Sequence, residues 1–252
     1  MPALAETLDQ RAARLEPHFT VQRPAGEGPF PVVIMLHGCG GPRPFIQDMA
    51  KVATEAGAAA IVVDSFAHRR IGRIGAYSTV CTGARLQGRE RAGDLYAAFA
   101  WARAQGWADN RRISAIGWSH GGWTIMDALA LRSGAEMQRA TGLAGLPDEP
   151  LDGLASAMMV YPYAGIGTYV GRRDWRIAPR AIAIVAERDT IVGDSRAALA
   201  RQIQRNSSLE VVVFETATHA FEDAEARDLR VRFDAAATAR EHQMLREMVA
   251  GL

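Results

Sequence analysis

Lysine is almost absent from the sequence, and neither sign of charge dominates it. Lys51 is the only lysine, so nearly all the positive charge is carried by arginine. The 29 basic and 28 acidic residues give a formal net charge of +1 at pH 7. Proteins that bind nucleic-acid phosphates present a strongly basic face, and this balance offers none. We therefore expect no nucleic-acid partner, and we assign most arginines to the solvated surface rather than to anion recognition.

Long apolar runs are missing as well. No window approaches the roughly 18 uncharged apolar residues that a membrane-spanning helix needs. The first ten residues, MPALAETLDQ, carry acids where a signal peptide requires a positive end and an apolar core. The sequence therefore predicts a soluble, cytoplasmic protein that does not bind a membrane.

Cysteine is scarce, with only Cys39 and Cys81 in the chain. Neither a cysteine pair at zinc spacing nor a His-Glu-x-x-His helix is present, so we expect no metal and no other cofactor. A reducing cytosol favours two free thiols, and a disulfide between the two cysteines is the alternative.

The composition that remains is that of a globular enzyme. Hydrophobic residues make up 48% of the chain and charged residues 23%. A chain of 252 residues leaves little material for a second core, and no repeat or flexible linker divides it. We expect one domain over residues 1–252, in which residues 1–17 form at most a peripheral N-terminal helix.

Short apolar runs alternate with stretches of helical pattern. Buried strands are predicted at residues 31–38, 58–64, 112–117, 157–161, 181–186 and 210–214. Helices are predicted at residues 45–56, 90–104, 121–131 and 194–204, and at a C-terminal segment that contains Leu245, Met248, Val249 and Leu252. This alternation indicates an α/β fold with a mostly parallel, doubly wound sheet and helices on both faces. Ligands of such sheets bind beyond the carboxyl ends of the strands.

The strongest local motif is Gly117-Trp118-Ser119-His120-Gly121, between a predicted strand and a predicted helix. A strand and a helix joined this tightly need glycines on both sides of the serine, and the turn exposes the serine hydroxyl. By itself the pattern is also compatible with a simple strand-to-helix turn. Its context favours Ser119 as a nucleophile, with the backbone N–H of His120 facing the oxyanion.

A second loop, His37-Gly38-Cys39-Gly40-Gly41, follows the first predicted strand of the sheet. Its glycines let the backbone approach a substrate closely, so we assign the other oxyanion donor to the N–H of Cys39. His37 is interpreted as a packing residue of this loop rather than as a base. Cys39 is not expected to be the nucleophile, because it lacks the tight turn around Ser119.

Two further strand ends supply an acid and a base. Asp189 follows the strand at 181–186, and His219 follows the strand at 210–214. A carboxylate there can hold a histidine in the tautomer that removes a proton from serine. The order serine, acid, histidine, with spacings of 70 and 30 residues, leaves room for the intervening elements. Asp194 is the competing acid, but it is better explained as the N-cap of the helix that follows.

These pieces together resemble the dienelactone hydrolase family of α/β-hydrolases. The matching residues span positions 30 to 221 and comprise the loop at 37–41, Asp64-Ser65-Phe66, the turn at 117–122, Asp189 and His219-Ala220-Phe221. The resemblance implies an α/β-hydrolase fold and hydrolysis of a carboxylic ester or lactone by acylation and deacylation of the nucleophile. The family's namesake enzyme uses a cysteine nucleophile, whereas position 119 is serine here. The sequence therefore favours a serine esterase that acts on a small molecule.

The walls of the substrate pocket are less well determined. Aromatic residues that could form an apolar acyl site are Trp118, Tyr77 and Tyr161, followed by Tyr163 and Trp123; each could equally belong to the core. The arginines at 69, 70, 73 and 85, in the unassigned segment 69–88, could recognise a substrate carboxylate, although solvent exposure is the favoured role. Monomer and homodimer both remain open.

Three alternative functions compete with ester hydrolysis. Peptide hydrolysis or acyl transfer could use the same three residues, and a protein of this fold could also bind a ligand without catalysis. A nucleotide site is suggested by Gly38-x-Gly40 with Asp64 placed 24 residues later. The third glycine is missing, and Pro42 and Pro44 on either side of Arg43 are expected to disturb the helix start that would receive a phosphate.

Overall fold

A seven-stranded sheet forms the centre of the molecule in the computed structural model, which describes residues 5–72, 79–80, 85–206 and 208–251. The strand order is β2-β4-β3-β5-β7-β8-β9. The bounds are β2 Phe19–Gln22, β3 Phe30–Leu36, β4 Ala59–Val63, β5 Ala108–Trp118, β7 Leu154–Val160, β8 Arg180–Ala186 and β9 Leu209–Phe214. All neighbours pair in parallel except β2, which runs antiparallel to β4 at the edge.

The six predicted strands are confirmed as β3, β4, β5, β7, β8 and β9, with ends that shift by at most four residues. They were recognisable because both faces of a central parallel strand are buried, which makes the run continuously apolar. The edge strand β2 was not predicted. Its two central residues are exposed, so its four residues carry no continuous apolar signal.

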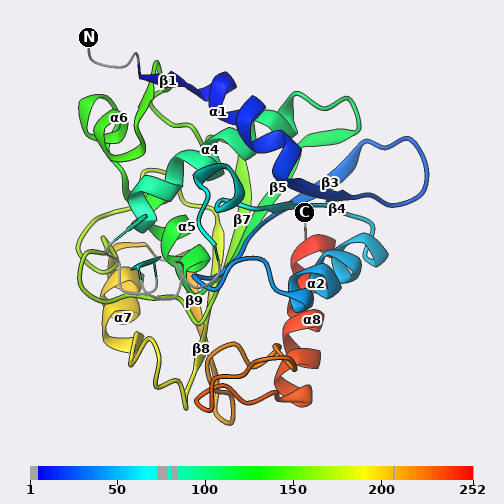
Figure 1. The fold of residues 1–252 in the computed structure, drawn as a ribbon, viewed down its shortest axis with the longest axis vertical. Coiled ribbons are helices and arrows are strands. Elements are labelled where there is room, and N and C mark those ends of the chain that lie inside the picture. The colour runs from blue at the N-terminus through cyan, green and yellow to red at the C-terminus, as the bar shows by residue number, and fades with distance from the viewer. Residues whose placement is uncertain (1–4, 73–78, 81–84, 207, 252) are drawn as a thin grey trace.

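Helices cover both faces of this sheet, as the sequence predicted (Figure 1). One side carries α4 (Gly88–Arg103), α5 (His120–Ala130) and α7 (Arg196–Arg205), and the other carries α2 (Pro44–Glu55) and α8 (Ala235–Ala250). Alternate residues of β3 divide accordingly. Val32, Ile34 and Leu36 join the core under α4 and α5, whereas Val33 and Met35 join the core under α2 and α8.

The N-terminal segment contributes to the first of these cores. Helix α1 (Leu8–Leu15) is followed by a short 3-10 turn, η1 (Glu16–His18), and it buries Ala12 and Leu15 against the core beneath α4. A two-stranded parallel sheet joins β1 (Glu6–Thr7) to β6 (Leu143–Ala144), which follows α6 (Ala135–Thr141). A helix is therefore present within the N-terminal segment, and it lies at the surface with one face buried against the core beneath α4.

Helix α2 forms despite the two prolines at its start. The helix begins at Pro44, directly after its N-cap Arg43. Proline is compatible with the first turn of a helix, because the N–H that it lacks has no intrahelical acceptor there. The two prolines therefore place the helix start beside the glycine loop instead of disturbing it.

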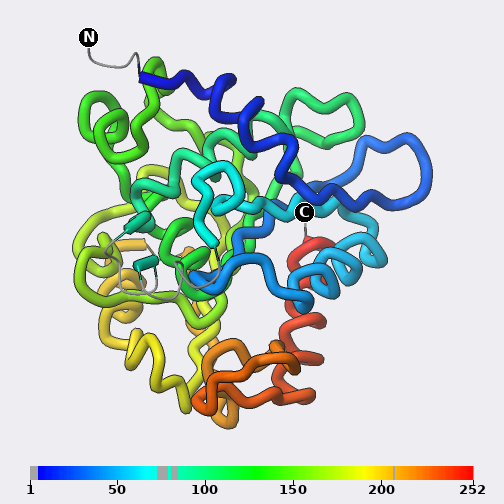
Figure 2. The backbone as a smooth tube through the Cα atoms, in the orientation of Figure 1, coloured from blue at the N-terminus to red at the C-terminus, as the bar shows by residue number. Residues whose placement is uncertain are grey.

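Loops at the carboxyl ends of β3, β5 and β8, together with the segment after β9, meet at one edge of the sheet. Figure 2 traces the last of these as an orange segment between β9 and α8, which lies beside the start of α8. All four predicted site loops therefore lie on the side where a doubly wound sheet binds its ligands.

Candidate active site

Ser119 lies in a turn that only neighbouring glycines permit. β5 ends at Trp118 and α5 begins at His120, which leaves Ser119 with a φ of 52° and a ψ of −108°. A Cβ at Gly117 would lie 2.4 Å from the carbonyl carbon of Gly121, and a Cβ at Gly121 would lie 2.0 Å from the carbonyl oxygen of Leu36. The positive φ of a non-glycine residue is costly and concentrates at functional sites. The predicted turn is thus present and strained.

His219 and Asp189 are in direct contact. The Nδ1 of His219 lies 2.6 Å from Oδ2 of Asp189, and both side chains are largely buried. The other carboxylate oxygen of Asp189 accepts the backbone N–H groups of Ile191 (2.8 Å) and Val192 (3.1 Å). Two backbone N–H groups hold the carboxylate of Asp189 in place, and this carboxylate in turn binds Nδ1 of His219. Nε2 is then the ring nitrogen that Asp189 does not occupy.

Asp194 does not compete for His219. It is exposed and forms a pair with Arg196 at 2.9 Å, which lowers the pKa of its carboxyl group through the hydrogen bonds of Arg196. The N-cap of α7 is Ser195, so the expectation that Asp194 occupies that position was wrong by one residue. Asp194 instead accepts the N–H of Arg196 from just outside the helix.

Ser119 and His219 line the same cavity, which has a volume of about 520 Å³. Its apolar wall is formed by Phe45, Trp118, Tyr161, Ile191, Ala220 and Val231. A cavity of this size and lining suits a small organic molecule. The structure therefore brings the predicted nucleophile and base to one surface, with the acid behind the base.

The glycine loop passes close beside the nucleophile. A Cβ at Gly38 would lie 3.4 Å from Cβ of Ser119, and Cys39 lines the cavity next to it. His120 is the first residue of α5, so its backbone N–H has no acceptor within the helix. Both predicted oxyanion donors therefore belong to backbone segments that adjoin Ser119.

Two buried histidines support these loops as neutral groups. Burial and the neighbouring Arg91 guanidinium lower the pKa of His120 to about 3 and that of His37 well below its ordinary value. The Nε2–H of His120 donates to the carbonyl oxygen of Leu86 (2.7 Å), and Nε2 of His37 accepts the N–H of Ser65 (3.2 Å). The contact of His37 with Ser65 fits the packing role that was predicted for this histidine.

Arg91 links the glycine loop to α4. Its Nη1 donates to the carbonyl oxygen of His37 (2.7 Å), and its Nε donates to Oγ of Ser65 (2.8 Å). The side chain is completely buried, and burial lowers its pKa to about 9. A buried guanidinium with fixed acceptors holds this loop in one position.

The predicted aromatic wall is only partly present. Trp118 and Tyr161 line the cavity. Trp123 and Tyr163 pack against each other with ring centroids 5.2 Å apart, and neither lines it. Tyr77 lies outside the described residues.

The arginines of the segment 69–88 have other roles. Arg69 donates to Asp94 at 2.6 and 2.9 Å, so its expected solvation was wrong. Arg70 and Arg85 are exposed, and neither lines the cavity. Arg73 lies outside the described residues.

One wall of the cavity was missed entirely. The segment between His219 and α8 contributes charged side chains to it, namely those of Asp223, Glu225, Arg227, Asp228 and Arg230. The sequence did contain an indication of this wall. The segment directly follows a predicted site residue at a strand end and has no strand or helix pattern of its own. Arg43 fastens it to the start of α2 through two hydrogen bonds to Asp223, at 2.7 and 3.1 Å.

Cys39 corrects another expectation. It is disulfide-bonded, and no described cysteine is free. Cys81, the other cysteine of the sequence, lies outside the described residues. A bonded sulfur cannot serve as a thiolate nucleophile, which is consistent with the expectation that Cys39 is not the nucleophile.

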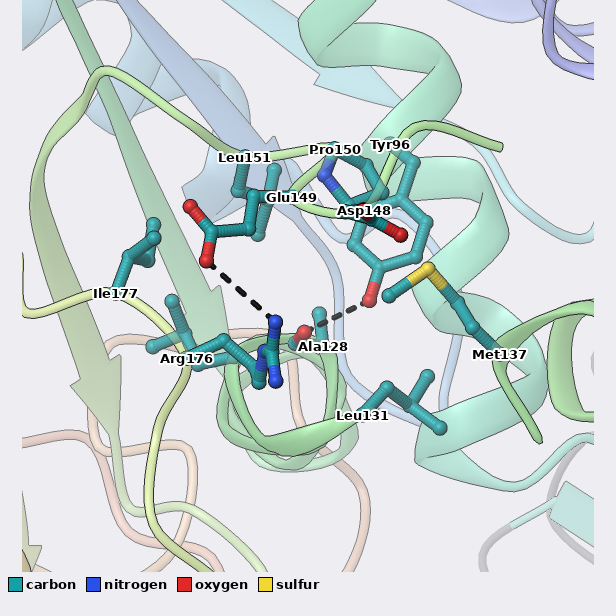
Figure 3. Close-up of a pocket in the computed structure, with 11 residues that line it drawn as sticks. Tyr96, Ala128, Leu131, Met137, Asp148, Glu149, Pro150, Leu151, Arg176 and Ile177 are labelled. Atoms are coloured by element: carbon teal, nitrogen blue, oxygen red, sulfur yellow. Dashed lines mark hydrogen bonds and ion pairs between the residues drawn. The ribbon is translucent and has the colours of Figure 1, made fainter. Parts of the chain in front are cut away.

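A second recess, between α4, α5 and residues 148–151, is too small for a substrate (Figure 3). Its volume is about 10 Å³, which holds about one water molecule. Tyr96 crosses it to donate to the carbonyl oxygen of Ala128 (2.7 Å), and Arg176 lies 3.6 Å from Glu149 at its rim. A recess of about 490 Å³ lies next to it, lined by residues that include Arg132, Arg173 and Trp175, but it contains none of the predicted site residues. The cavity at Ser119 is the one that combines a substrate-sized volume with those residues.

Comparison with known proteins agrees with this geometry. The family model described as "Dienelactone hydrolase family" matches residues 19–250, which is most of the chain. The chain belongs to the dienelactone hydrolase family. Membership identifies it as a carboxylic ester hydrolase with the α/β-hydrolase fold. No curated protein sequence matches it.

Solved structures of this family share the fold at low sequence identity. A dienelactone hydrolase from Anabaena variabilis is 17% identical with a TM-score of 0.61, and the alignment covers 92% of this chain and 90% of that one. Thermogutta terrifontis esterase 2, in a form phosphoramylated by tabun, is 16% identical with a TM-score of 0.67, and the coverage is 92% and 88%. Both likenesses concern the fold.

The described residues contain neither a candidate membrane span nor a candidate metal site. None of their helices has the length and apolar character that a membrane span requires. Within the same ranges, no three His, Cys, Asp or Glu side chains are grouped as ligands for a metal ion.

Proposed function

We propose that this member of the dienelactone hydrolase family is a serine hydrolase that cleaves a small carboxylic ester or lactone through an acyl-enzyme on Ser119. The observation that carries the proposal is the hydrogen bond of 2.6 Å between Asp189 and His219, on a cavity that His219 shares with the strained turn at Ser119. A histidine oriented in this way on the same cavity as a serine is the arrangement that activates a hydroxyl for acyl transfer.

In the proposed first step, the hydroxyl oxygen of Ser119 attacks the substrate carbonyl while Nε2 of His219 accepts the hydroxyl proton. The N–H groups of Cys39 and His120 stabilise the oxyanion that forms. His219 then gives its proton to the departing alkoxide, which leaves the acyl group on Ser119. Asp189 stays ionised and holds the imidazolium in place.

In the second step, His219 takes a proton from water, and the resulting hydroxide attacks the acyl carbonyl. The oxygen of Ser119 leaves with the proton from His219, and the carboxylic acid is released. A lactone follows the same steps, except that its alcohol stays attached to the acyl group.

The first test is Ser119→Ala. We expect kcat/KM for short p-nitrophenyl esters to fall by about a thousandfold or more, because the acyl-enzyme cannot form. Ser133→Ala, in the loop between α5 and α6 and away from the cavity, is the matched control and should keep wild-type activity. A folded Ser119→Ala variant with most of its esterase activity would refute the proposal.

Covalent labelling gives a second readout. An organophosphonate should add one phosphonyl group per chain, and peptide mapping should place it on Ser119. Aminoacyl amides assayed beside the esters distinguish ester from peptide hydrolysis. Folded protein that is neither labelled nor active on any ester would indicate a binding protein.

A further inference from the structure

Two buried glutamates lie behind the catalytic wall of the cavity. Glu222 follows His219 by three residues, and Glu241 is in the second turn of α8. Their exposed fractions are 4% and 0%, and the two carboxyl groups lie within hydrogen-bonding reach of each other. The reaction proposed above uses neither of them. Buried acids without a cation are uncommon, because burial strongly disfavours the charged form.

Each carboxyl group also holds one aromatic side chain of the cavity wall. Oε2 of Glu222 accepts the hydroxyl of Tyr161 at 2.8 Å, and Oε1 of Glu241 accepts Nε1–H of Trp118 at 2.9 Å. The remaining oxygens, Oε1 of Glu222 and Oε2 of Glu241, are buried and have no other partner among the described residues. Two carboxyl oxygens can hydrogen-bond only through a proton, so the pair must contain one.

Within the described part of the chain, neither carboxyl group forms an ion pair with an arginine or lysine. Besides each other, the titratable groups that act on the pair are Tyr161 and His219, both through Glu222. Burial raises the pKa of both acids, and the neighbouring Glu222 raises the pKa of Glu241 further, well above its ordinary value. His219 acts on Glu222, and an imidazolium there favours the charged form of Glu222, so the arrangement favours the proton on Glu241 and the single negative charge on Glu222.

Both aromatic side chains connect the pair to the reacting groups. The ring of Tyr161 packs on that of His219, with centroids 4.6 Å apart, and Tyr161 has a φ of 35° that needs support from its surroundings. Trp118 directly precedes Ser119 in the strained turn. The pair thus lies one side chain away from both the base and the nucleophile.

We propose that Glu222 and Glu241 form a carboxyl pair with one shared proton, which positions Tyr161 and Trp118 and keeps one negative charge behind His219. The charge favours the imidazolium that forms when His219 takes the proton of Ser119. Because Glu241 holds the proton, only one of the two carboxyl groups is negatively charged. Neither glutamate lines the cavity, so both act as positioning residues. The kinetic part of this inference rests on the proposed function, whereas the shared proton does not.

The kinetic test compares three variants. Glu241→Gln can donate to Glu222 and accept from Trp118 as the protonated acid does, so this conservative variant should restore the activity that Glu241→Ala loses. The double variant E222Q/E241Q keeps the shape but removes the charge. Its kcat should fall by about five- to tenfold with KM within about twofold, and the acid limb of its kcat/KM profile should move to lower pH by about half a unit.

Two results would overturn the catalytic part. One is an acid limb in E222Q/E241Q at the same pH as in the wild type. The other is a loss in E241Q as large as that in the double variant, since E241Q retains the charge on Glu222.

A stability measurement tests the shared proton without any substrate. In the unfolded chain Glu241 is ionised above pH 5, whereas the folded protein keeps its proton, so the stability that this proton confers is lost as the pH rises through neutrality. From pH 5 upward to pH 9 the unfolding equilibrium constant of the wild type should rise relative to that of E241Q, by up to tenfold per pH unit until the pH passes the folded pKa of Glu241. Parallel curves for the two proteins would refute the pair. If the chain hydrolyses no ester, the proposed function fails while this measurement still decides the pair.

Discussion

Single residues decide whether the turn at Ser119 can exist. Gly117 and Gly121 face each other where β5 enters α5, and the carbonyl of Leu36 on β3 fills the space in which a Cβ of Gly121 would lie. The contact of 2.0 Å is with backbone in the centre of the sheet, so no side-chain rotation can relieve it. A nucleophile held by such a turn depends on three segments at once.

We therefore expect Gly121→Ala to destabilise the protein by more than about 4 kcal/mol, because the helix or the strand must move. Urea denaturation followed by circular dichroism measures this loss. Gly106→Ala is the control, since a Cβ at Gly106 meets nothing within 4 Å, and it should change stability by less than about 1 kcal/mol. A Gly121→Ala protein as stable as the control would show that the turn tolerates a side chain.

The sequence indicated some site residues and not others for a physical reason. Ser119 is recognisable because its turn imposes glycines at fixed spacing, and Asp189 and His219 because each follows a buried strand. Glu222 and Glu241 lie on a loop and a helix, with no fixed spacing between them. Their contact is set by how α8 packs on the sheet, and only the tertiary structure shows it.

At the scale of elements, α1 is joined to α4 by a buried ion network. Asp94 of α4 accepts Nη1 of Arg11 from α1 at 2.8 Å and two nitrogens of Arg69 from η2 (Ala67–Arg69), and its side chain is not exposed. Burial alone would raise the pKa of Asp94, but the guanidinium groups of Arg69 and Arg11 outweigh it and hold the pKa well below its ordinary value. The carboxylate therefore stays charged under all ordinary conditions.

Removing the charge of Asp94 should destabilise the folded protein strongly. Asp94→Asn leaves Arg69 without its paired carboxylate among the described residues and leaves Arg11 with Glu6 alone, which is expected to cost about 3–5 kcal/mol. Asp109→Asn breaks an exposed ion pair with Arg112 and should cost less than about 1 kcal/mol. Because the folded pKa of Asp94 lies below the unfolded one, its contribution is present above about pH 4 and is lost as the pH falls further. Thermal unfolding of the wild type and of the two variants between pH 2.5 and 7 measures the loss of stability and its pH dependence. Equal losses of stability in Asp94→Asn and Asp109→Asn would contradict the ion network.

Elements differ in how far their sequence reveals them. Strands β3, β4 and β8 were predictable because burial on both faces makes them continuously apolar. β2 pairs only with β4 and exposes its central residues, so tertiary pairing rather than its own pattern makes it a strand. Helix α6 has seven residues, of which only Met137 and Thr141 are buried, too few to show a period.

For the whole molecule, the alternation of strands and helices was enough to predict the sheet and the edge at which the site lies. It could not predict the charge around the cavity. Most of that charge comes from the irregular segment after His219, which lines the mouth of the cavity with Arg227, Arg230, Asp223, Glu225 and Asp228, and Arg43 adds a third cation from the start of α2. Asp223 pairs with Arg43 at 2.7 Å and Asp228 with Arg230 at 2.6 Å. Three charges of each sign, on a chain with a net charge of +1, give the mouth no dominant field.

This balance predicts how the enzyme treats a substrate that carries a free carboxylate. In a field without a dominant sign, one added charge should be worth at most about 1 kcal/mol near exposed groups. We therefore expect mono-p-nitrophenyl succinate and p-nitrophenyl butyrate, which have equally long acyl chains, to differ by less than about tenfold in kcat/KM. Raising NaCl from 20 to 500 mM should change the ratio by less than about threefold, because screening has little net charge to act on. A preference for the succinate of a hundredfold that salt abolishes would instead mean that one of the mouth arginines is available to the substrate, and Arg227→Gln would then remove that preference.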